Sequence, residues 1–251
     1  MMQKDGLPLS SGVILAAHEA LMSLGGSTDA NPGSYRKQSV RVGSLLPPPA
    51  NKIPDLMADL EKYINGADSL PPLIKAGLVH VQFETIHPFL DGNGRIGRLL
   101  IVLMLIDSGL LSSAAIYPSY YFKKNHFEYY ARLNAVEKEG DFEGWILFYL
   151  KAIELSSFDA YQRAKKIAQL EQTIKNKNIH DLAPSVTDFL FQSPIVSVTD
   201  VARYLEKSYN TAKHLVELFV GADLLVAMTE QKRNKLYRFA PYLDLLEEEF
   251  E

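Results

Sequence analysis

The stretch that decides the fold is IHPFLDGNGRIGRLL, residues 86–100. It places the breaker residues DGNG directly before a long apolar segment with helical spacing. A hairpin turn at Asn-Gly is excluded, because a helix-period segment follows instead of an alternating strand. An EF-hand loop is excluded, because Phe89 and Leu100 would occupy ligand positions that require acidic residues. A P-loop is excluded, because no Lys-Ser/Thr pair follows the glycines.

The remaining interpretation is an anion site at a helix N-terminus. The first N–H groups of a helix lack internal partners and carry partial positive charge, and glycines before them allow close approach by phosphate oxygens. Arg95 and Arg98 are three residues apart and share one helix face near that end. Asp91 offers a hard oxygen for Mg²⁺ that also binds phosphates, and His87 can accept a proton near neutral pH. The stretch therefore predicts phosphoryl or nucleotidyl transfer.

The bulk composition is that of an ordinary globular protein. The chain has 251 residues, 47% of them hydrophobic and 22% charged, and a formal net charge of −4 that gives no overall attraction to nucleic acid or anionic membranes. The absence of cysteine excludes disulfides, thiolate metal sites and cysteine nucleophiles. The N-terminus lacks a secretory pattern, and the apolar run 99–106 is far shorter than the ~20 residues of a membrane span. We therefore expect a cytoplasmic protein without a membrane partner.

The spacing of apolar residues predicts a mainly α protein in more than one part. The expected helices of the first part cover residues 9–24, 55–65, 72–86, 95–108, 122–139 and 141–157. A short extended segment at 39–43 precedes the prolines at 47–49, which prevent further strand pairing. A charged helical connector covers 156–181. From 182 the expected order is that of a winged helix: a helix at 184–192, a helix–turn–helix at 197–205 and 211–225, and two strands within 226–240.

The decisive stretch also resembles a known family. HPFLDGNGRIGR, residues 87–98, matches the Fic-domain signature H-x-F-x-[DE]-G-N-G-R-x-x-R at every defined position. YRKQSVRVG and the following PPP resemble the Fic flap and its neighbour, and residues 126–150 resemble the helices after the Fic core. The resemblance implies a Fic helical core with a short β flap over 1–155, followed by the connector and a winged helix-turn-helix domain over 182–251.

The resemblance implies a protein adenylyltransferase, which moves AMP from ATP to a Ser, Thr or Tyr hydroxyl of a protein target or of the chain itself. In such a protein His87 is the general base, Phe89 anchors the loop in the core, and Asp91 binds Mg²⁺. The phosphate contacts fall on the loop and the first helical turn: the α-phosphate on the backbone of Gly92, Asn93 and Gly94 with help from the Asn93 side chain, and the β- and γ-phosphates on Arg95 and Arg98.

The resemblance also implies which type of reaction is favoured and how the target binds. Relatives that phosphorylate carry a bulkier residue at the position of Gly94, so glycine favours AMP transfer. The flap at Val40, Arg41, Val42 and Gly43 should pair with the target's backbone by strand addition, with Val42 and Gly43 beside the nucleotide. Tyr129 and Tyr130 resemble an aromatic pair near adenine, although core packing at a helix start explains them equally well.

Regulation is the main departure from the family pattern. Many Fic proteins are inhibited by a helix bearing [ST]-x-x-x-E-[GN], whose Glu pairs with the second arginine. This chain contains no such motif, so we expect an unrestrained or N-terminally shortened form. Removal of AMP uses much the same residues and stays an alternative. It is less favoured, because known relatives rely on that glutamate for it.

Other histidines and aromatic residues have simpler explanations. His80 lies two helical turns before His87 and is expected to be a core or supporting histidine, because no third zinc ligand is apparent. A surface or packing role is expected for four others, His18, His126, His180 and His214. A core stripe is expected for Trp145 with Phe142, Phe148 and Tyr149.

The C-terminal part leaves a second function class open. Asn210, Thr211 and Lys213 on its recognition helix, with Lys232 and Arg233 on its wing, are candidates for contact with DNA or a partner. However, residues 183–245 carry equal numbers of basic and acidic residues, unlike a basic DNA reader. Packing, homodimerisation or partner docking is therefore favoured. The alternative is a DNA-binding regulator whose Fic part senses nucleotide.

Overall fold

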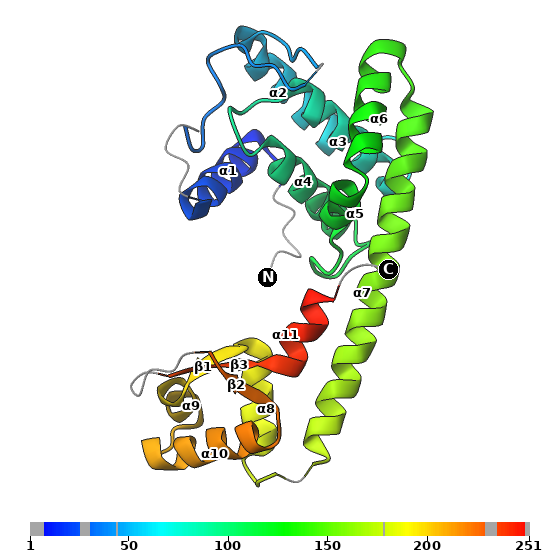
Figure 1. Ribbon diagram of the computed structural model, residues 1–251. Coiled ribbons are helices and arrows are strands. Elements are labelled where there is room, and N and C mark those ends of the chain that lie inside the picture. Colours follow the sequence, from blue (N-terminus) through cyan, green and yellow to red (C-terminus); the bar gives the residue numbers. More distant parts are fainter. Residues whose placement is uncertain (1–7, 26–30, 44, 178, 229–234, 249–251) are drawn as a thin grey trace. The chain divides into compact units, whose positions relative to one another are not determined.

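The computed structural model describes residues 8–25, 31–43, 45–177, 179–228 and 235–248. The chain divides into two compact units, Met1–Phe158 and Asp159–Glu251. The expectation of a mainly α protein is confirmed, and a single small sheet lies in the described part of the second unit (Figure 1). In the described residues, no helix has the length and apolar character needed to cross a membrane.

The first unit is a bundle of helices. In chain order its elements are α1 (Ser11–Gly25), the short 3-10 turn η1 (Ala50–Lys52), α2 (Ile53–Asn65), α3 (Pro72–Ile86), α4 (Asn93–Asp107), α5 (Pro118–Lys124), α6 (His126–Glu139) and the start of α7 (Phe142–Lys175). Ser10 caps α1, because its hydroxyl accepts the Val13 N–H at 3.3 Å. α4 packs along α3 and also contacts α1 (Figure 1). The loop between α3 and α4 is therefore held by three helices.

Aromatic residues of α7 close the core against α3. Trp145 and Tyr149 are fully buried, and the Trp145 Nε1–H donates to the Gly77 carbonyl at 2.8 Å. A Cβ at Gly77 would lie 2.7 Å from Cδ1 of Tyr149, so only glycine allows this close approach. The expected core stripe is confirmed for Trp145, Phe148 and Tyr149, whereas Phe142 is 45% exposed.

Among the helix boundaries that differ from the sequence expectation, three have a clear local cause. The expected helix 122–139 is two helices, α5 and α6, because the Asn125 side chain donates to the Tyr121 carbonyl at 2.9 Å and competes with the helical backbone. The expected helix 141–157 continues into the connector as α7, since the sequence holds no Gly or Pro between residues 145 and 175. α4 begins at Asn93, two residues early, because Gly92 forms its N-cap with φ 82°.

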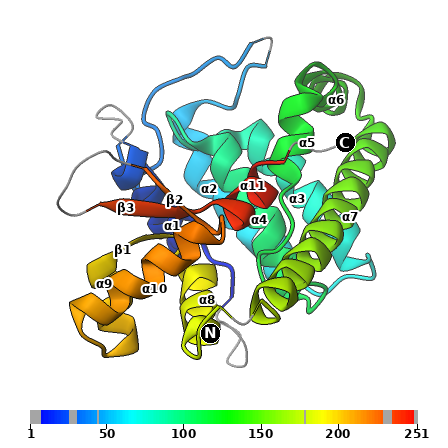
Figure 2. The same cartoon turned by 60° about the horizontal axis from the view of Figure 1, so that its bottom comes forward.

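The second unit contains the end of α7 followed by α8 (Ala183–Gln192), β1 (Ile195–Ser197), α9 (Val198–Leu205), α10 (Tyr209–Gly221), β2 (Leu225–Ala227), β3 (Leu236–Phe239) and α11 (Ala240–Glu247). The sheet is antiparallel in the order β1-β3-β2, with Ile195 opposite Arg238 and Leu225 opposite Phe239. Figure 2 shows α8, α9 and α10 gathered on one side of these strands.

This unit has its own core and well-formed helix starts. Leu190, Leu215, Phe219 and Phe239 are fully buried within it. Ser197 and Asp200 form a reciprocal capping box at α9, and Ser208 caps α10. The order of the elements agrees with the expected winged helix, an assignment that stays a prediction. β1 and α11 were not predicted from the sequence, because a three-residue strand and a single two-turn helix carry too little periodicity.

Candidate active site

The loop between α3 and α4 is anchored by a buried phenylalanine. α3 ends at Ile86, and the following residue, His87, has a left-handed backbone (φ 49°) that turns the chain while its N–H still donates to the Phe83 carbonyl at 3.0 Å. Two residues later Phe89 is fully buried and stacks on His18 of α1, with ring centroids 3.8 Å apart. The sharp turn and this stacked ring together fix where the loop begins.

The side chain of Asn93 braces the same loop. Its Oδ1 accepts the Phe89 N–H at 2.9 Å, and its Nδ2 donates to the Phe89 carbonyl at 2.8 Å. Asn93 is 2% exposed, so this amide is an internal part of the loop. Its observed contacts are with the backbone, and the predicted contribution to phosphate orientation stays a prediction.

The N-terminus of α4 is left open to an anion. Gly92 supplies the positive φ that starts the helix, and a Cβ there would crowd Met22 and His18 at 3.2–3.3 Å. Asp91 Oδ1 accepts the Gly92 N–H at 2.6 Å. Gly92, the N-cap of α4, has no side chain with which to cap the following N–H groups. The first N–H groups of α4, from Asn93 onward, are therefore available to phosphate oxygens.

Both arginines of the motif lie at this helix start. Arg95 is exposed and its Nη2 lies 3.3 Å from Asp91 Oδ2. Arg98 is half-buried, and its Nε donates to the Ser119 hydroxyl of α5 at 2.9 Å. A Cβ at Gly94 would lie 2.9 Å from Arg98 Nη1, so this guanidinium folds back over the first turn of the helix. In this conformation the guanidinium of Arg98 fills the space beside Gly94.

His87 has the surroundings of a general base. Its Nδ1 lies 3.4 Å from the Glu84 carbonyl, an arrangement that places the proton on Nδ1 and leaves Nε2 free to accept one. Burial lowers the pKa of His87 below its usual 6.5, the Glu84 carbonyl opposes this, and the positive charge of Arg36 lowers the pKa further. The imidazole is thus neutral at neutral pH, as a base requires.

Polar groups are buried beneath the helix start. A Cβ at Gly97 would lie 2.5 Å from Glu84 Oε1 and 3.2 Å from His80 Nδ1, so both side chains of α3 face α4 there. Burial raises the pKa of Glu84 to about 7 and lowers that of His80 to about 4. The expectation of a core histidine at His80 is confirmed, since it is fully buried.

The two tyrosines of α6 are separated by the structure. Tyr129 is 6% exposed, its hydroxyl lies 3.0 Å from His80 Nε2, and its ring packs against Phe122 with centroids 5.0 Å apart. Tyr129 therefore has the core packing that was expected as the alternative, because its hydroxyl and ring both make contacts inside the bundle, and an adenine contact by this residue stays a prediction. Tyr130 is 52% exposed, and its ring makes an edge contact with Tyr129, with centroids 5.4 Å apart.

The structure adds supporting residues that the sequence did not single out. His18 is fully buried; its Nδ1 accepts the Gly33 N–H at 3.1 Å, so Nε2 carries the proton and donates to the Asp91 carbonyl at 3.1 Å. The packing role expected for His18 is thus confirmed. Arg36 and Ser119 likewise support the motif from distant segments. Arg36 lies in the segment that resembles the flap, but no sequence pattern predicts the hydrogen-bond partners of Arg36 or Ser119.

The flap is a tight turn instead of a regular strand. Val42 and Leu45 exchange both backbone hydrogen bonds, at 3.0 and 3.2 Å, and Gly43 has φ 59°. Arg41 is exposed, and its Nε donates to the Gly43 carbonyl at 3.2 Å. Val40 and Arg41 precede this turn without belonging to a strand. Pairing of this segment with a target by strand addition stays a prediction.

The donor set fits Mg²⁺ bound together with phosphates. Asp91 is the acidic residue of the loop, and the described residues contain no group of three or more His, Cys, Asp or Glu that could hold a metal alone. Mg²⁺ commonly binds through one or two carboxylates plus substrate phosphates. One carboxylate beside an open helix N-terminus meets that requirement.

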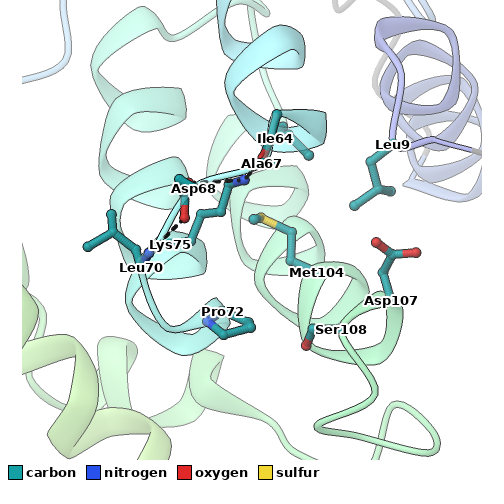
Figure 3. A pocket seen from close by; sticks show the side chains of 11 residues that line it. Leu9, Ile64, Ala67, Asp68, Leu70, Pro72, Lys75, Met104, Asp107 and Ser108 are labelled. Carbon is teal, nitrogen blue, oxygen red and sulfur yellow. Dashed lines mark hydrogen bonds and ion pairs between the residues drawn. The ribbon is translucent and has the colours of Figure 1, made fainter.

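A pocket at the other end of α4 is unrelated to this chemistry. It has a volume of about 260 Å³ and is lined by Met104, Asp107 and Ser108 together with residues near the end of α2 and the start of α3 (Figure 3). Lys75 in its wall is already paired with Asp68 at 3.2 Å. The motif residues 87–98 lie outside its lining.

The candidate contact residues on the expected recognition helix differ in their surroundings. Thr211 belongs to the cap of α10, because its N–H and hydroxyl both contact the Ser208 hydroxyl. Lys213 lies 3.7 Å from Glu217, and Asn210 is exposed. The predicted wing residues Lys232 and Arg233 lie outside the described residues.

The comparisons with known proteins match the part of the chain that contains this motif. A model of the Fic/DOC family matches residues 8–105. The protein adenylyltransferase Fic of Drosophila mojavensis is 30% identical over 153 residues, which are 59% of this chain and 29% of that protein. The protein of the same name from Drosophila grimshawi is 32% identical over 131 residues, or 51% of this chain and 26% of that one. This chain thus spans less than a third of these curated relatives.

A solved structure extends the likeness along the chain. The Fic family protein from Desulfovibrio desulfuricans G20 aligns with a TM-score of 0.56 and 26% identity, covering 94% of this chain and 70% of its own. The match of the family model includes the whole motif and the flap segment. Residues 8–105 of this chain are thus similar to the Fic/DOC family.

Proposed function

We propose that this chain is a protein adenylyltransferase, which transfers AMP from ATP to a hydroxyl group of a protein. The observation that carries the proposal is the open N-terminus of α4, with Arg95 and Arg98 beside it and the neutral imidazole of His87 at the preceding turn. The relatives named protein adenylyltransferase support the same activity. Ser, Thr or Tyr hydroxyls are the acceptors that such a base can activate.

The chemical step requires one proton acceptor and one leaving group. Nε2 of His87 takes the proton of the target hydroxyl as its oxygen attacks the α-phosphorus of ATP. A bond forms between that oxygen and the α-phosphorus, the bond from the α-phosphorus to the bridging oxygen breaks, and pyrophosphate leaves. The lowered pKa of His87 keeps the imidazole ready to accept a proton at neutral pH.

The α4 N-terminus stabilises the charge that this step develops. Its first N–H groups face the α-phosphate, while Arg95 and Arg98 neutralise the outer phosphates. Asp91 would hold Mg²⁺, which when bound supplies further charge neutralisation on the phosphates. Because these groups are fixed by the Phe89 anchor and the Asn93 brace, they need little rearrangement during the reaction.

The test uses Mg²⁺ and ATP that carries a label in its α-phosphate. One incubation contains the chain alone, and a second contains the chain together with a cell lysate. We expect labelled protein with the natural chain and a loss of about 10²–10⁴-fold in His87→Ala. His126→Ala, an exposed histidine of α6, is the matched control and should keep full labelling. Calorimetry should show unchanged ATP affinity in His87→Ala. Labelling that survives in His87→Ala would overturn the proposal.

A further inference from the structure

Arg36 is a buried arginine outside the signature motif. It is 2% exposed, and burial lowers the pKa of its guanidinium. A charged side chain is almost never fully buried unless its hydrogen-bonding groups are satisfied. Its partners therefore indicate what the residue is for.

All of these partners are backbone carbonyls. Nε donates to the carbonyl of His87 at 2.8 Å, Nη1 to that of Gln38 at 2.8 Å, and Nη2 to those of Pro48 at 2.6 Å and Ile86 at 3.4 Å. No acidic side chain is among these acceptors in the described part of the chain. The guanidinium is thus used for its rigid planar array of donors, a geometry that a lysine cannot reproduce.

These carbonyls belong to the two segments that must meet during the proposed reaction. Gln38 and Pro48 lie on the two arms of the segment that carries the flap turn at Val42–Leu45. Ile86 and His87 form the turn that presents the base. The backbone N–H of Arg36 adds a fifth bond, to the carbonyl after His87, at 2.9 Å.

We propose that Arg36 is a positioning residue that joins both arms of the flap to the backbone of the general base and thereby sets the distance between the docked target and His87. The inference rests on the proposed function. It adds that the flap and the base form one unit, which is separate from the nucleotide-binding start of α4. None of the Arg36 bonds reaches residues 91–98.

This separation predicts a specific kinetic effect. In Arg36→Met the flap arms and the His87 turn lose their common partner, whereas the N–H groups of α4 and the arginines of the motif keep their contacts. We expect the rate of AMP transfer to fall about 100-fold, the effect of a displacement near 1 Å, with the KM for ATP within about twofold of the natural value. Arg36→Lys keeps the charge without the planar array and should retain only part of the rate.

The decisive measurement does not depend on activity. Hydrogen–deuterium exchange of the full chain without nucleotide should show amides of 36–48 and 84–90 exchanging about 10–100-fold faster in Arg36→Met, as expected for losing hydrogen bonds to a charged group. Exchange in α6 and α10 should be unchanged. Lys37→Met, the exposed neighbour, is the control and should match the natural chain.

The outcomes separate this inference from the proposed function. Unchanged exchange and transfer in Arg36→Met would overturn the inference. So would exchange accelerated throughout the first unit together with lost ATP binding, because Arg36 would then only support the core. If Arg36→Met does not fold, the same two measurements, hydrogen–deuterium exchange and the rate of AMP transfer, are made on Arg36→Lys and decide the inference. If even the natural chain transfers no AMP, the proposed function fails, while the exchange pattern still decides whether Arg36 joins flap and base.

Discussion

Glu84 is a carboxyl group placed in the core of the first unit. Its Oε1 accepts no hydrogen bond in the described structure, and burial raises its pKa from 4.5 to about 7. A raised pKa means that the folded chain binds the proton more tightly than the unfolded chain. The protonated carboxyl therefore contributes about 3 kcal/mol to the free energy of unfolding. This contribution is complete below pH 4.5 and is lost as the pH rises to about 7.

Glu84→Gln should remove this dependence on pH. Urea unfolding followed by the fluorescence of Trp145 should show the variant gaining stability relative to the natural chain between pH 5 and pH 8, by about 2–3 kcal/mol. Glu139→Gln, at an exposed position of α6, should give a difference that does not vary with pH. A constant difference for Glu84→Gln as well would show that the carboxyl keeps an ordinary pKa.

The residues of the site fall into two groups, according to how far along the sequence their hydrogen-bond partners lie. The bonds of Asn93 reach four residues back, so a contiguous motif contains both the residue and its partner. Arg36 bonds a carbonyl 51 residues away, and Arg98 bonds a hydroxyl 21 residues away. The motif was therefore predictable from the sequence, whereas its supports were not, since their pairing depends on which loops the fold brings together.

Among the helices, α3 and α7 approach each other because α3 carries Gly77. An alanine in a helix is ordinarily better than glycine by about 0.5–1 kcal/mol. At Gly77 the added methyl group would meet the fully buried ring of Tyr149 at 2.7–2.9 Å, so overpacking should outweigh that gain.

Gly77→Ala should destabilise the first unit by about 1–3 kcal/mol in urea unfolding. Gly12→Ala is the matched control in α1, where a Cβ meets only Ser10 Oγ at an ordinary 3.6 Å, and it should be neutral or slightly stabilising. Equal effects of the two substitutions would show that α3 and α7 can separate at no cost.

The local sequence predicted which segments are helical better than it predicted where each helix begins and ends. α3 was expected at 72–86 and begins and ends there. The break between α5 and α6 was missed, because it depends on one side chain of Asn125 bonding the preceding turn. The flap was expected to be extended, but it closes as a turn at Gly43, whose positive φ gives the chain an alternative to a strand.

At the scale of the whole molecule, each unit contains its own buried core. Trp145, the only tryptophan of the sequence, lies in the first unit, whereas Phe219 is fully buried in the second. Unfolding of the two units can therefore be followed separately. Trp145 fluorescence reports the first unit, and the loss of helical ellipticity that does not coincide with the fluorescence change reports the second.

Phe219→Ala should destabilise the second unit by about 3–5 kcal/mol, because it removes a large buried side chain. The thermal midpoint reported by Trp145 should stay unchanged, while part of the helical signal melts at lower temperature. Val220→Ala, 38% exposed on the same helix, is the control with little effect on either signal. A shift of the Trp145 midpoint in Phe219→Ala would mean that the units unfold together.

The sequence by itself determined the helical class and located the helix start whose residues we propose as anion site, base and metal ligand. These are local properties: helix dipole, glycine freedom and residue spacing act within a few positions along the chain. Only the tertiary structure decided that Tyr129 packs in the core, that Ser119 holds Arg98 and that Arg36 joins flap to base. Each of these depends on contacts between segments far apart in the chain, and burial alone makes such contacts strong enough to matter.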